Sequence, residues 1–427
     1  MDMAVSEVVR QHLIDPEICI RCNTCEATCP VGAITHDARN YVVDADKCKT
    51  CMACVPPCPT GAIDNWRAVP RARVYGLGEQ FGWDSLPPEL SAEQLRSAGV
   101  LPDAEPAVEP LAPEPAAAAG HEEVVFEAAR YGATIPPWSA AHAYTNLYGP
   151  KASEKSVTAA VVGNVRVTEV GREYDTHHIV LDFGAMPFPV LEGQSIGIVP
   201  PGVDADGRPY RPRQYSVASP RNGERPGYNN VSLTVKRVLQ DHRGNPVHGT
   251  GSNYLCDLNV GDRVQVIGPF GASFLMPNHP RSNIVMICTG TGSAPMRAMT
   301  EWRRRLRKSG KFEGGRLMLF FGARTREELP YFGPLMTLPK DFIDINLALS
   351  RTQGQPKVYV QDLMRARAAD LGPMVGDPNT YFYVCGLKAM EEGVVLALRD
   401  VAIQAGLDWS ATAVALKREG RLHLETY

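Results

Sequence analysis

The spacing of hydrophobic and polar positions changes along the chain and divides it into segments of different kinds. Residues 157–276 contain short stretches in which apolar and polar residues alternate, such as VTAAVVGNVRV and VSLTVKRV, separated by Gly, Pro and Asn. Alternation with period two is typical of strands with one buried face, so we predict an antiparallel β-barrel over 151–278. From Asn283 onward, apolar strands alternate with helical stretches such as PMRAMTEWRRRLRKSG. This order predicts an α/β domain over 279–427, with a parallel sheet and helices on both faces.

The first 66 residues contain an internal repeat. The stretch ICIRCNTCEATCPVGAI recurs 29 residues later as KCKTCMACVPPCPTGAI, which indicates two copies of one small α+β unit. A connector follows over 67–150, and its middle, residues 102–120, is almost wholly Pro, Ala and acidic residues. Such a composition buries too little apolar surface to offset the entropy of ordering, so we predict a disordered tether there. The expected parts are therefore 1–66, a linker over 67–150, 151–278 and 279–427.

The composition is typical of a soluble globular protein, and it argues against a nucleic-acid partner and a membrane partner. At 427 residues the chain exceeds one ordinary core. The 44 basic and 47 acidic residues give a net charge of −3, which does not favour a nucleic-acid partner. No apolar run approaches the roughly 20 residues that span a bilayer, and the first residues lack the apolar stretch of a signal peptide. We expect a cytoplasmic protein with no membrane partner.

Eight of the 11 cysteines lie between Cys19 and Cys58, and both copies of the repeat read C-x2-C-x2-C-x3-C-P. Three thiolates at this spacing can reach three corners of a cubic iron–sulfur cluster, while the fourth ligates the other cluster in two-cluster ferredoxins. A disulfide scaffold belongs to oxidising compartments. Zinc is the other alternative, but it has little use for the third cysteine and the Cys-Pro. The segment resembles bacterial-type ferredoxins with two [4Fe–4S] clusters, and the inferred ligand sets are Cys19, Cys22, Cys25 with Cys58, and Cys48, Cys51, Cys54 with Cys29.

Four short stretches in the rest of the chain suit a flavin and a dinucleotide. Arg213–Ser216 offers an arginine for a pyrophosphate, an aromatic ring and a hydroxyl. Gly249–Leu255 is a glycine-rich turn that opens a helix, and its N–H groups can face a phosphate. Gly290–Arg297 follows a predicted strand, where a dinucleotide binds in open α/β sheets. The fourth is the C-terminal Leu422–Tyr427. Taken singly, each also fits an ordinary strand, loop or chain end.

In this order the four stretches resemble the plant-type ferredoxin–NADP reductase family over residues 155–427. The resemblance implies that Tyr427 stacks on the flavin where the nicotinamide must sit, with Glu425 nearby. It implies that Cys385 lies beside the reacting nicotinamide carbon, although a buried structural cysteine is the alternative reading. The implied FAD residues are Arg213, Gln214, Tyr215, Ser216, Thr234, Val235, Lys236, Thr250, Gly251, Ser252 and Tyr427. The implied catalytic residues are Ser216, Cys385, Glu425 and Tyr427, and Thr291 belongs to the dinucleotide loop.

The choice of nucleotide is indicated at the end of the strand INLAL. A 2′-phosphate needs cationic donors and hydroxyls, whereas an unphosphorylated ribose is held by an acid at the corresponding strand end. The residues here match the reductase family's NADP-selective pattern, and no acid stands among them. NADPH is therefore favoured over NADH, and the implied nucleotide residues are Ser350, Arg351, Lys357 and Tyr359.

The two halves complement each other chemically. NADPH delivers two electrons at once as hydride, whereas an iron–sulfur cluster accepts one electron at a time. A flavin can exchange electrons either in pairs or singly. The domain order resembles the reductase component of the aerobic benzoyl-CoA 2,3-epoxidase, which implies electron delivery to a separate di-iron oxygenase. The chain itself has no E-x-x-H pair for such a site. Two alternatives stay open: a fused ferredoxin:NADP oxidoreductase that reduces NADP from low-potential donors, and a non-enzymatic binding module with degenerate sites.

Overall fold

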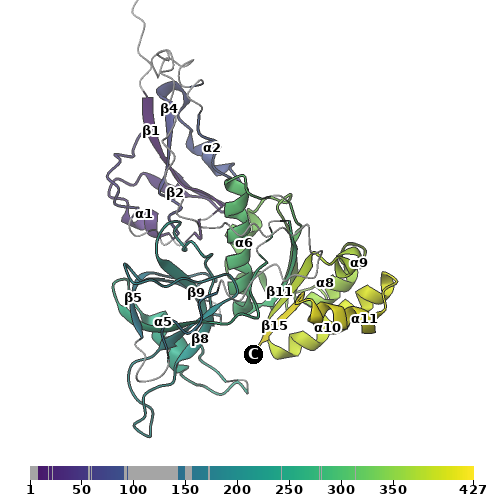
Figure 1. The fold of residues 1–427 in the computed structure, drawn as a ribbon. Helices are drawn as coiled ribbons and strands as arrows, with labels where there is room; N and C mark the ends of the chain where they lie inside the picture. The colour runs from purple at the N-terminus through teal and green to yellow at the C-terminus, as the bar shows by residue number, and fades with distance from the viewer. Residues whose placement is uncertain are drawn as a thin grey trace, which may run out of the picture.

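Helix α6 (Ser293–Lys308) lies where three bodies of the chain meet (Figure 1). The computed structural model describes residues 8–90, 94, 143–149 and 156–427, apart from positions 18, 22, 56, 57, 59, 172, 173, 242, 278, 280 and 313. Proline in the first turn and basic residues in the last turn favour a helix over this stretch, because they suit its free N–H groups and its dipole. The predicted tether at 102–120 lies outside the described residues.

The N-terminal body is built from two short antiparallel sheets around a small apolar core. Strand β1 (Val8–Leu13) pairs with β4 (Asn65–Pro70), and β2 (Ile34–His36) pairs with β3 (Tyr41–Val43). Helix α1 (Thr24–Thr28) belongs to the first copy of the repeat. The core contains Ile14, Ile34, Tyr41, Val43 and Ile63, with the cysteines packed beside them.

Ordered structure in this body continues past residue 66, where the linker was expected to begin. Strand β4 extends to Pro70, the 3-10 turn Arg71–Arg73 follows, and then helix α2 (Leu77–Phe81). The Asn40 amide donates to the carbonyl oxygens of Gln80, Phe81 and Trp83, at 3.3, 3.1 and 2.7 Å. The repeat ends before this segment, so its periodicity could not reveal a flanking strand that pairs with β1.

The central body is a six-stranded antiparallel sheet in the order β8-β7-β10-β5-β6-β9. Strand β5 alternates between buried and more exposed positions, as its sequence predicts. A bridge between Val217 and Leu233 joins the chain just after β8 to β9, so the two edges of the sheet approach each other. The strands are β5 (Val157–Arg166), β6 (Thr176–Asp182), β7 (Ser195–Val199), β8 (Arg213–Ser216), β9 (Asn230–Lys236) and β10 (Arg263–Phe270), with helix α5 (Thr250–Asp257) between β9 and β10.

A short segment before this sheet, residues 143–149, lies against it. The Tyr148 backbone forms a bridge with Gly268, and the Gln194 amide donates to the Tyr144 carbonyl oxygen at 2.9 Å. The Tyr148 ring stacks on Phe188, with ring centroids 5.7 Å apart. The Tyr148 ring and the Tyr144 backbone therefore contact the antiparallel body, a partner that the sequence alone did not identify.

The C-terminal body is a five-stranded parallel sheet in the order β13-β12-β11-β14-β15. One apolar cluster fills the face covered by α8 to α11, and another fills the face against α6 and α7. The order reverses between β11 and β14. The elements are β11 (Asn283–Thr289), β12 (Leu317–Ala323), α7 (Phe332–Met336), β13 (Ile343–Leu349), α8 (Val360–Ala366), α9 (Ala368–Gly376), β14 (Thr380–Gly386), α10 (Lys388–Gln404), α11 (Trp409–Arg418) and β15 (Leu422–Thr426), with 3-10 turns at Gly290–Gly292 and Arg326–Glu328.

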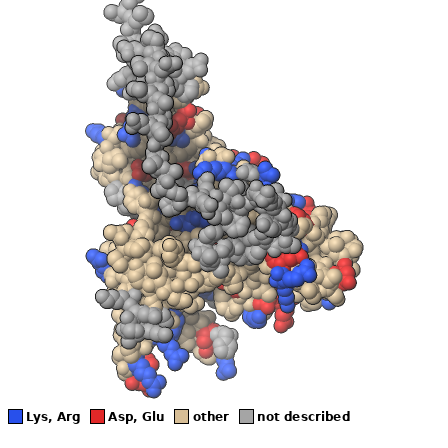
Figure 2. Space-filling model, viewed as in Figure 1, with Lys and Arg blue, Asp and Glu red and all other residues tan. Residues whose placement is uncertain are grey.

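Charged side chains of both signs are interspersed over the face drawn in Figure 2, and no broad field of one sign covers its described part. Among the described residues, every helix is too short or too polar to cross a membrane.

Candidate functional site

The cysteines of the repeat line two separate cavities. The first is lined by Cys19, Cys25 and Cys58, and the second by Cys29, Cys48, Cys51 and Cys54. Across the described residues no three His, Cys, Asp or Glu side chains are arranged to hold a single metal ion. Both sets mix cysteines from the two copies, in the combinations expected for two clusters. Cys22 lies outside the described residues.

Both copies of the repeat adopt the same unusual backbone around their cysteines. Arg21 and Asn23 have φ angles of 58° and 61°, and the residues 29 positions later, Thr50 and Met52, have φ angles of 51° and 62°. Left-handed backbone is rare for residues other than glycine, and it is concentrated where a loop has a functional constraint. Its recurrence at equivalent positions therefore supports a shared role for the loops, which turn successive cysteines toward one cavity.

Strand β8 and helix α5 meet at Gly251. A Cβ atom on Gly251 would lie 2.8 Å from the Tyr215 hydroxyl oxygen and 2.9 Å from Cγ of Arg213, so only glycine permits this approach. The first turn of α5, with its free N–H groups, therefore lies beside Arg213, whose side chain is exposed. This arrangement suits a pyrophosphate. Gln214 is exposed, while Tyr215 and Ser216 are partly buried.

The strand β9 residues predicted to hold the flavin point in different directions. The Thr234 hydroxyl bonds to the Tyr331 hydroxyl at 2.7 Å, and Val235 is buried in the sheet core. The Lys236 ammonium lies 3.7 Å from the centre of the Tyr174 ring. The structure therefore places Lys236 at the surface of the antiparallel body and turns Thr234 toward the parallel one.

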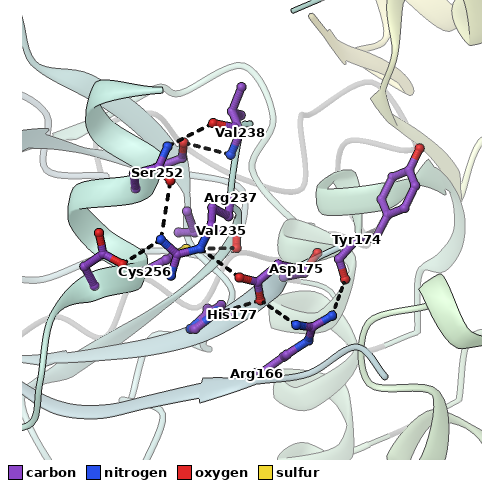
Figure 3. A network of polar contacts seen from close by, with 12 residues as sticks. Arg166, Tyr174, Asp175, His177, Val235, Arg237, Val238, Ser252 and Cys256 are labelled. Carbon is purple, nitrogen blue, oxygen red and sulfur yellow. Dashed lines mark hydrogen bonds and ion pairs between the residues drawn. The ribbon is translucent and has the colours of Figure 1, made fainter. Parts of the chain in front are cut away.

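Residues next to β9 form the polar network of Figure 3. The Arg237 guanidinium donates to the Asp175 carboxylate at 2.8 Å, and the Ser252 hydroxyl accepts from the Val238 backbone N–H at 3.1 Å. Ser252 also donates to the Gly249 carbonyl oxygen at 3.3 Å. These contacts tie the end of β9 to α5 and fix the loop of the predicted flavin turn. Thr250 is the first residue of α5.

The predicted dinucleotide loop lies at the point where the order of the parallel sheet reverses. Strands β11 and β14 are neighbours, with Cys288 opposite Cys385. A Cβ atom on Gly292 would lie 2.2 Å from the Cys385 carbonyl oxygen, so the loop backbone packs directly on the end of β14. In open α/β sheets, ligands bind outside the carboxyl ends of the strands at this reversal. The loop and Cys385 therefore share the favoured binding position of the fold.

The C-terminal strand brings Glu425 and Tyr427 to the same place. Glu425 is opposite Cys385 in the register of β14 and β15, and the Tyr427 hydroxyl lies 2.7 Å from the Thr291 hydroxyl. Burial raises the pKa of the Glu425 carboxyl to about 7. Burial, together with the charge of Glu425, raises the pKa of the Cys385 thiol to about 12. At neutral pH the thiol is therefore protonated and the carboxyl can take either form.

The residues predicted for a 2′-phosphate lie together after strand β13. Arg351, Lys357 and Tyr359 are exposed, and Ser350 is partly buried. The Arg351 backbone N–H donates to the Arg324 carbonyl oxygen at 2.7 Å, so the ends of β12 and β13 are joined there. These side chains form one exposed cationic and hydroxyl-bearing edge at the carboxyl ends of the strands.

A buried polar network between the two sheets was missed by sequence analysis. The Arg297 guanidinium on α6 donates to both oxygens of Glu224 at 2.7 Å and to the Ala218 carbonyl oxygen at 2.9 Å. His178 Nδ1 lies 2.9 Å from the Tyr331 hydroxyl. Burial lowers the pKa of His178 to about 4, so this imidazole is neutral. Arg297 belongs to the glycine-loop motif, but Glu224 lies in a loop without any recognisable pattern.

This network positions strand β8 against the glycine loop that precedes α6. Ala218 follows Ser216 by two residues, and Arg297 follows Ser293 by one helical turn. Burial alone would raise the pKa of Glu224, but the charge of Arg297 and hydrogen bonds from Arg297 and Ser232 hold that pKa below its usual range. The ion pair therefore fixes the approach of β8 to the start of α6.

Comparisons with known proteins match two parts of this chain to known families. The oxidoreductase NAD-binding domain family matches residues 286–395, and the 4Fe-4S dicluster domain family matches residues 18–62. The chain is 40% identical over 275 residues to the cyanelle ferredoxin–NADP reductase of Cyanophora paradoxa, covering 62% of this chain and 74% of that protein. It is 36% identical over 292 residues to the ferredoxin–NADP reductase of a Spirulina species, covering 66% and 98%.

Solved structures agree on the fold. The ferredoxin–NADP+ reductase from Plasmodium falciparum aligns with a TM-score of 0.52 and 20% identity, covering 66% of this chain and all of that one. Fold and comparisons thus define an oxidoreductase with an added 4Fe–4S ferredoxin domain. The chain belongs to the ferredoxin–NADP reductase family.

Proposed function

We propose that the chain takes hydride from NADPH onto an FAD held between its two sheets and passes single electrons to two [4Fe–4S] clusters in its N-terminal body. The observation that carries this proposal is the meeting of the glycine loop, Cys385 and Tyr427 at the sheet reversal. The same chain arranges the described cysteines of its repeat around two cavities. FAD, when bound, exchanges electrons both in pairs and singly, whereas each cluster accepts one at a time.

The chain's own residues have distinct parts in this proposal. Arg213 and the first turn of α5 bind the FAD pyrophosphate, while Tyr215 and Ser216 adjoin its ring. Tyr427, anchored by Thr291, covers the place of the nicotinamide and must move when NADPH binds. Glu425 can hold or release a proton beside Cys385 near neutral pH. The exposed residues that bind the 2′-phosphate are Ser350, Arg351, Lys357 and Tyr359.

The acceptor of the electrons is proposed to be a separate oxygenase component, the di-iron benzoyl-CoA 2,3-epoxidase. Domain order supports this choice: a two-cluster domain precedes a reductase, and the chain has no E-x-x-H pair. The acceptor can be tested separately from the reductase, by adding candidate oxygenases to the NADPH-reduced chain and following reoxidation of the clusters.

The test of the reductase assignment separates its two halves. In a Cys51→Ala variant one cluster should be lost, with about half of the iron, because one of its four ligands is absent. Transfer to outside acceptors should then fail, while NADPH should still bleach the flavin at the normal rate. Iron content and stopped-flow absorbance measure the two effects.

The neighbouring Met52→Ala variant is the matched control, because Met52 lies in the same loop and is exposed. It should keep all of its iron. Equal loss of flavin reduction and cluster reduction in Cys51→Ala would contradict the proposed division of labour.

A further inference from the structure

The N-terminal body is held on the reductase by ion pairs at the far end of α6. Lys308, the last residue of the helix, lies 2.5 Å from the Asp15 carboxylate and 2.7 Å from the Glu17 carboxylate. Arg304, one turn earlier, lies 3.6 Å from Glu17. Asp15, Glu17 and Arg304 are 3%, 7% and 2% exposed, whereas the Lys308 side chain is 41% exposed, so solvent and salt reach the lysine end of this contact.

Two further contacts complete this surface. The Arg225 guanidinium, from the loop between β8 and β9, donates to Asp64 at 2.6 Å. A Cβ atom on Gly333 of α7 would lie 2.9 Å from Cδ of Arg21, so the Arg21 side chain rests on that glycine. We call the surface made by Arg225, Arg304, Lys308 and Gly333 the holding surface.

The holding surface and the proposed flavin site lie at opposite ends of α6. The helix begins at Ser293, directly after the loop that bonds to Tyr427, and ends at Lys308. Fifteen steps along an α-helix cover roughly 22 Å. Figure 1 shows the same separation, with the C-terminus at one end of α6 and the N-terminal body at the other. The Cys19 backbone N–H donates to the Asp15 carbonyl oxygen at 3.1 Å, so the cysteine set that contains Cys19 lies close to the holding surface.

We propose that the holding surface is a resting position, which the N-terminal body must leave before electrons can pass from the flavin to its cysteine-bound clusters. This inference rests on the proposed function. Electron transfer slows exponentially with distance, so a body that stays at the far end of α6 receives electrons slowly. The 52 residues between Leu90 and Ala143 could reach well over 100 Å if extended at about 3.3 Å each, so the covalent connection permits the movement.

The effect of ionic strength on the rate of cluster reduction distinguishes a resting position from a position in which electrons pass to the clusters. Salt screens ion pairs, with a Debye length of about 30 Å at 0.01 M and about 3 Å at 1 M. Salt should therefore speed cluster reduction after the flavin has been reduced by NADPH. A decrease with salt would overturn the proposal, since it would mean that the held arrangement is the productive one.

A zero-length cross-link gives a second and more direct test. A carbodiimide joins a lysine amine to a carboxylate in contact, and Lys308 touches Asp15 and Glu17. Mass spectrometry of the full chain should find the amide between Lys308 and one of these residues. The cross-linked chain should keep NADPH-dependent flavin bleaching, while its cluster reduction should slow by about tenfold or more, equivalent to about 1.4 kcal/mol.

Variants control for side reactions and for folding. Lys308→Gln, treated identically, should show no cross-link and no slowing. Lys308→Glu should reduce its clusters faster than the unchanged chain, and Arg418→Glu, an exposed charge reversal on α11, should not. The proposal is overturned if the Lys308 amide does not form, or if the cross-linked chain reduces its clusters at the untreated rate. A chain whose untreated clusters never respond to NADPH instead overturns the proposed function, and this inference with it.

Discussion

Cys385 and Glu425 occupy opposing positions on the parallel strands β14 and β15, at the sheet edge where the glycine loop packs. Burial raises the pKa of Glu425 from 4.5 to about 7. The charge of Glu425 in turn adds to the effect of burial in raising the pKa of Cys385. Near neutral pH the Glu425 carboxyl can therefore gain or lose its proton, whereas the Cys385 thiol stays protonated.

This relationship predicts a pH dependence of stability. Between about pH 4.5 and 7 the folded chain binds more protons at Glu425 than the unfolded chain, so stability present at low pH should be lost as pH rises through 7. Because Glu425 is partly exposed, we expect about 1–3 kcal/mol. Denaturation at several pH values should show this fall in the unchanged chain and not in Glu425→Gln. The exposed Glu392→Gln on α10 should retain it; a retained fall in Glu425→Gln would contradict the assignment.

Removing Tyr427 should relax the choice of nucleotide. The Tyr427 hydroxyl bonds to Thr291, and the Tyr427 ring is proposed to cover the nicotinamide position. A nucleotide must displace this ring, and only NADPH has 2′-phosphate contacts that offset the cost of the displacement. A Tyr427→Ser variant should show a raised ratio of kcat/KM for NADH to that for NADPH. Steady-state kinetics with both nucleotides measure the ratio. Tyr144→Ser, another exposed tyrosine, is the control, and an unchanged ratio in Tyr427→Ser would rule out the covering role.

Adding one carbon to Gly251 should weaken flavin binding. The new Cβ atom would lie 2.8 Å from the Tyr215 hydroxyl oxygen and 2.9 Å from Cγ of Arg213, so both of these side chains would have to shift. Purified Gly251→Ala should contain less FAD and bind added FAD more weakly, as measured by absorbance and by fluorescence titration. Gly78→Ala in α2 has open space around its Cβ and should bind FAD normally. Full FAD content in Gly251→Ala would place the pyrophosphate elsewhere.

Breaking the Arg297–Glu224 pair should destabilise the chain strongly. Either Arg297→Met or Glu224→Gln leaves a buried charge unpaired, which typically costs about 3–5 kcal/mol. Chemical denaturation of both single variants and the double variant would give the coupling between the residues. The exposed pair Arg208–Asp206 should contribute about 0–1 kcal/mol in the same cycle. Similar small values for both pairs would exclude a structural role for the buried one.

Replacing Arg351 should affect one nucleotide only. Arg351 is exposed at the end of β13, and its proposed contact is with the 2′-phosphate. Arg351→Ala should weaken NADPH binding by about 1–3 kcal/mol through loss of a charge-assisted contact, and leave NADH unchanged. Dissociation constants for both nucleotides test this. Arg399→Ala, an exposed arginine on α10, should change neither, and an equal loss for NADH and NADPH would remove the 2′-phosphate role.

Local patterns in the sequence predicted most of what depends on neighbouring residues. The period-two alternation in β5 and the apolar strands from Asn283 onward follow from which faces are buried, and the parallel sheet forms where it was expected. The cysteine spacing also placed Cys58 with Cys19 and Cys29 with Cys48. The sequence singled out Gly251 and Gly292 as parts of glycine-rich loops, and the structure shows that a Cβ atom on either would lie within 3 Å of a neighbouring residue.

By itself, then, the sequence determined the element types, the repeated cysteine motif and the glycine loops, because short-range periodicity and covalent spacing encode them. Only the tertiary structure decided that Glu224 pairs with Arg297, that Thr234 turns to Tyr331, and that Asp15 and Glu17 meet the end of α6. These contacts join residues far apart in the chain, and a buried charge is stable only if the fold supplies its partner. No local pattern specifies such a partner, since it depends on how whole elements pack.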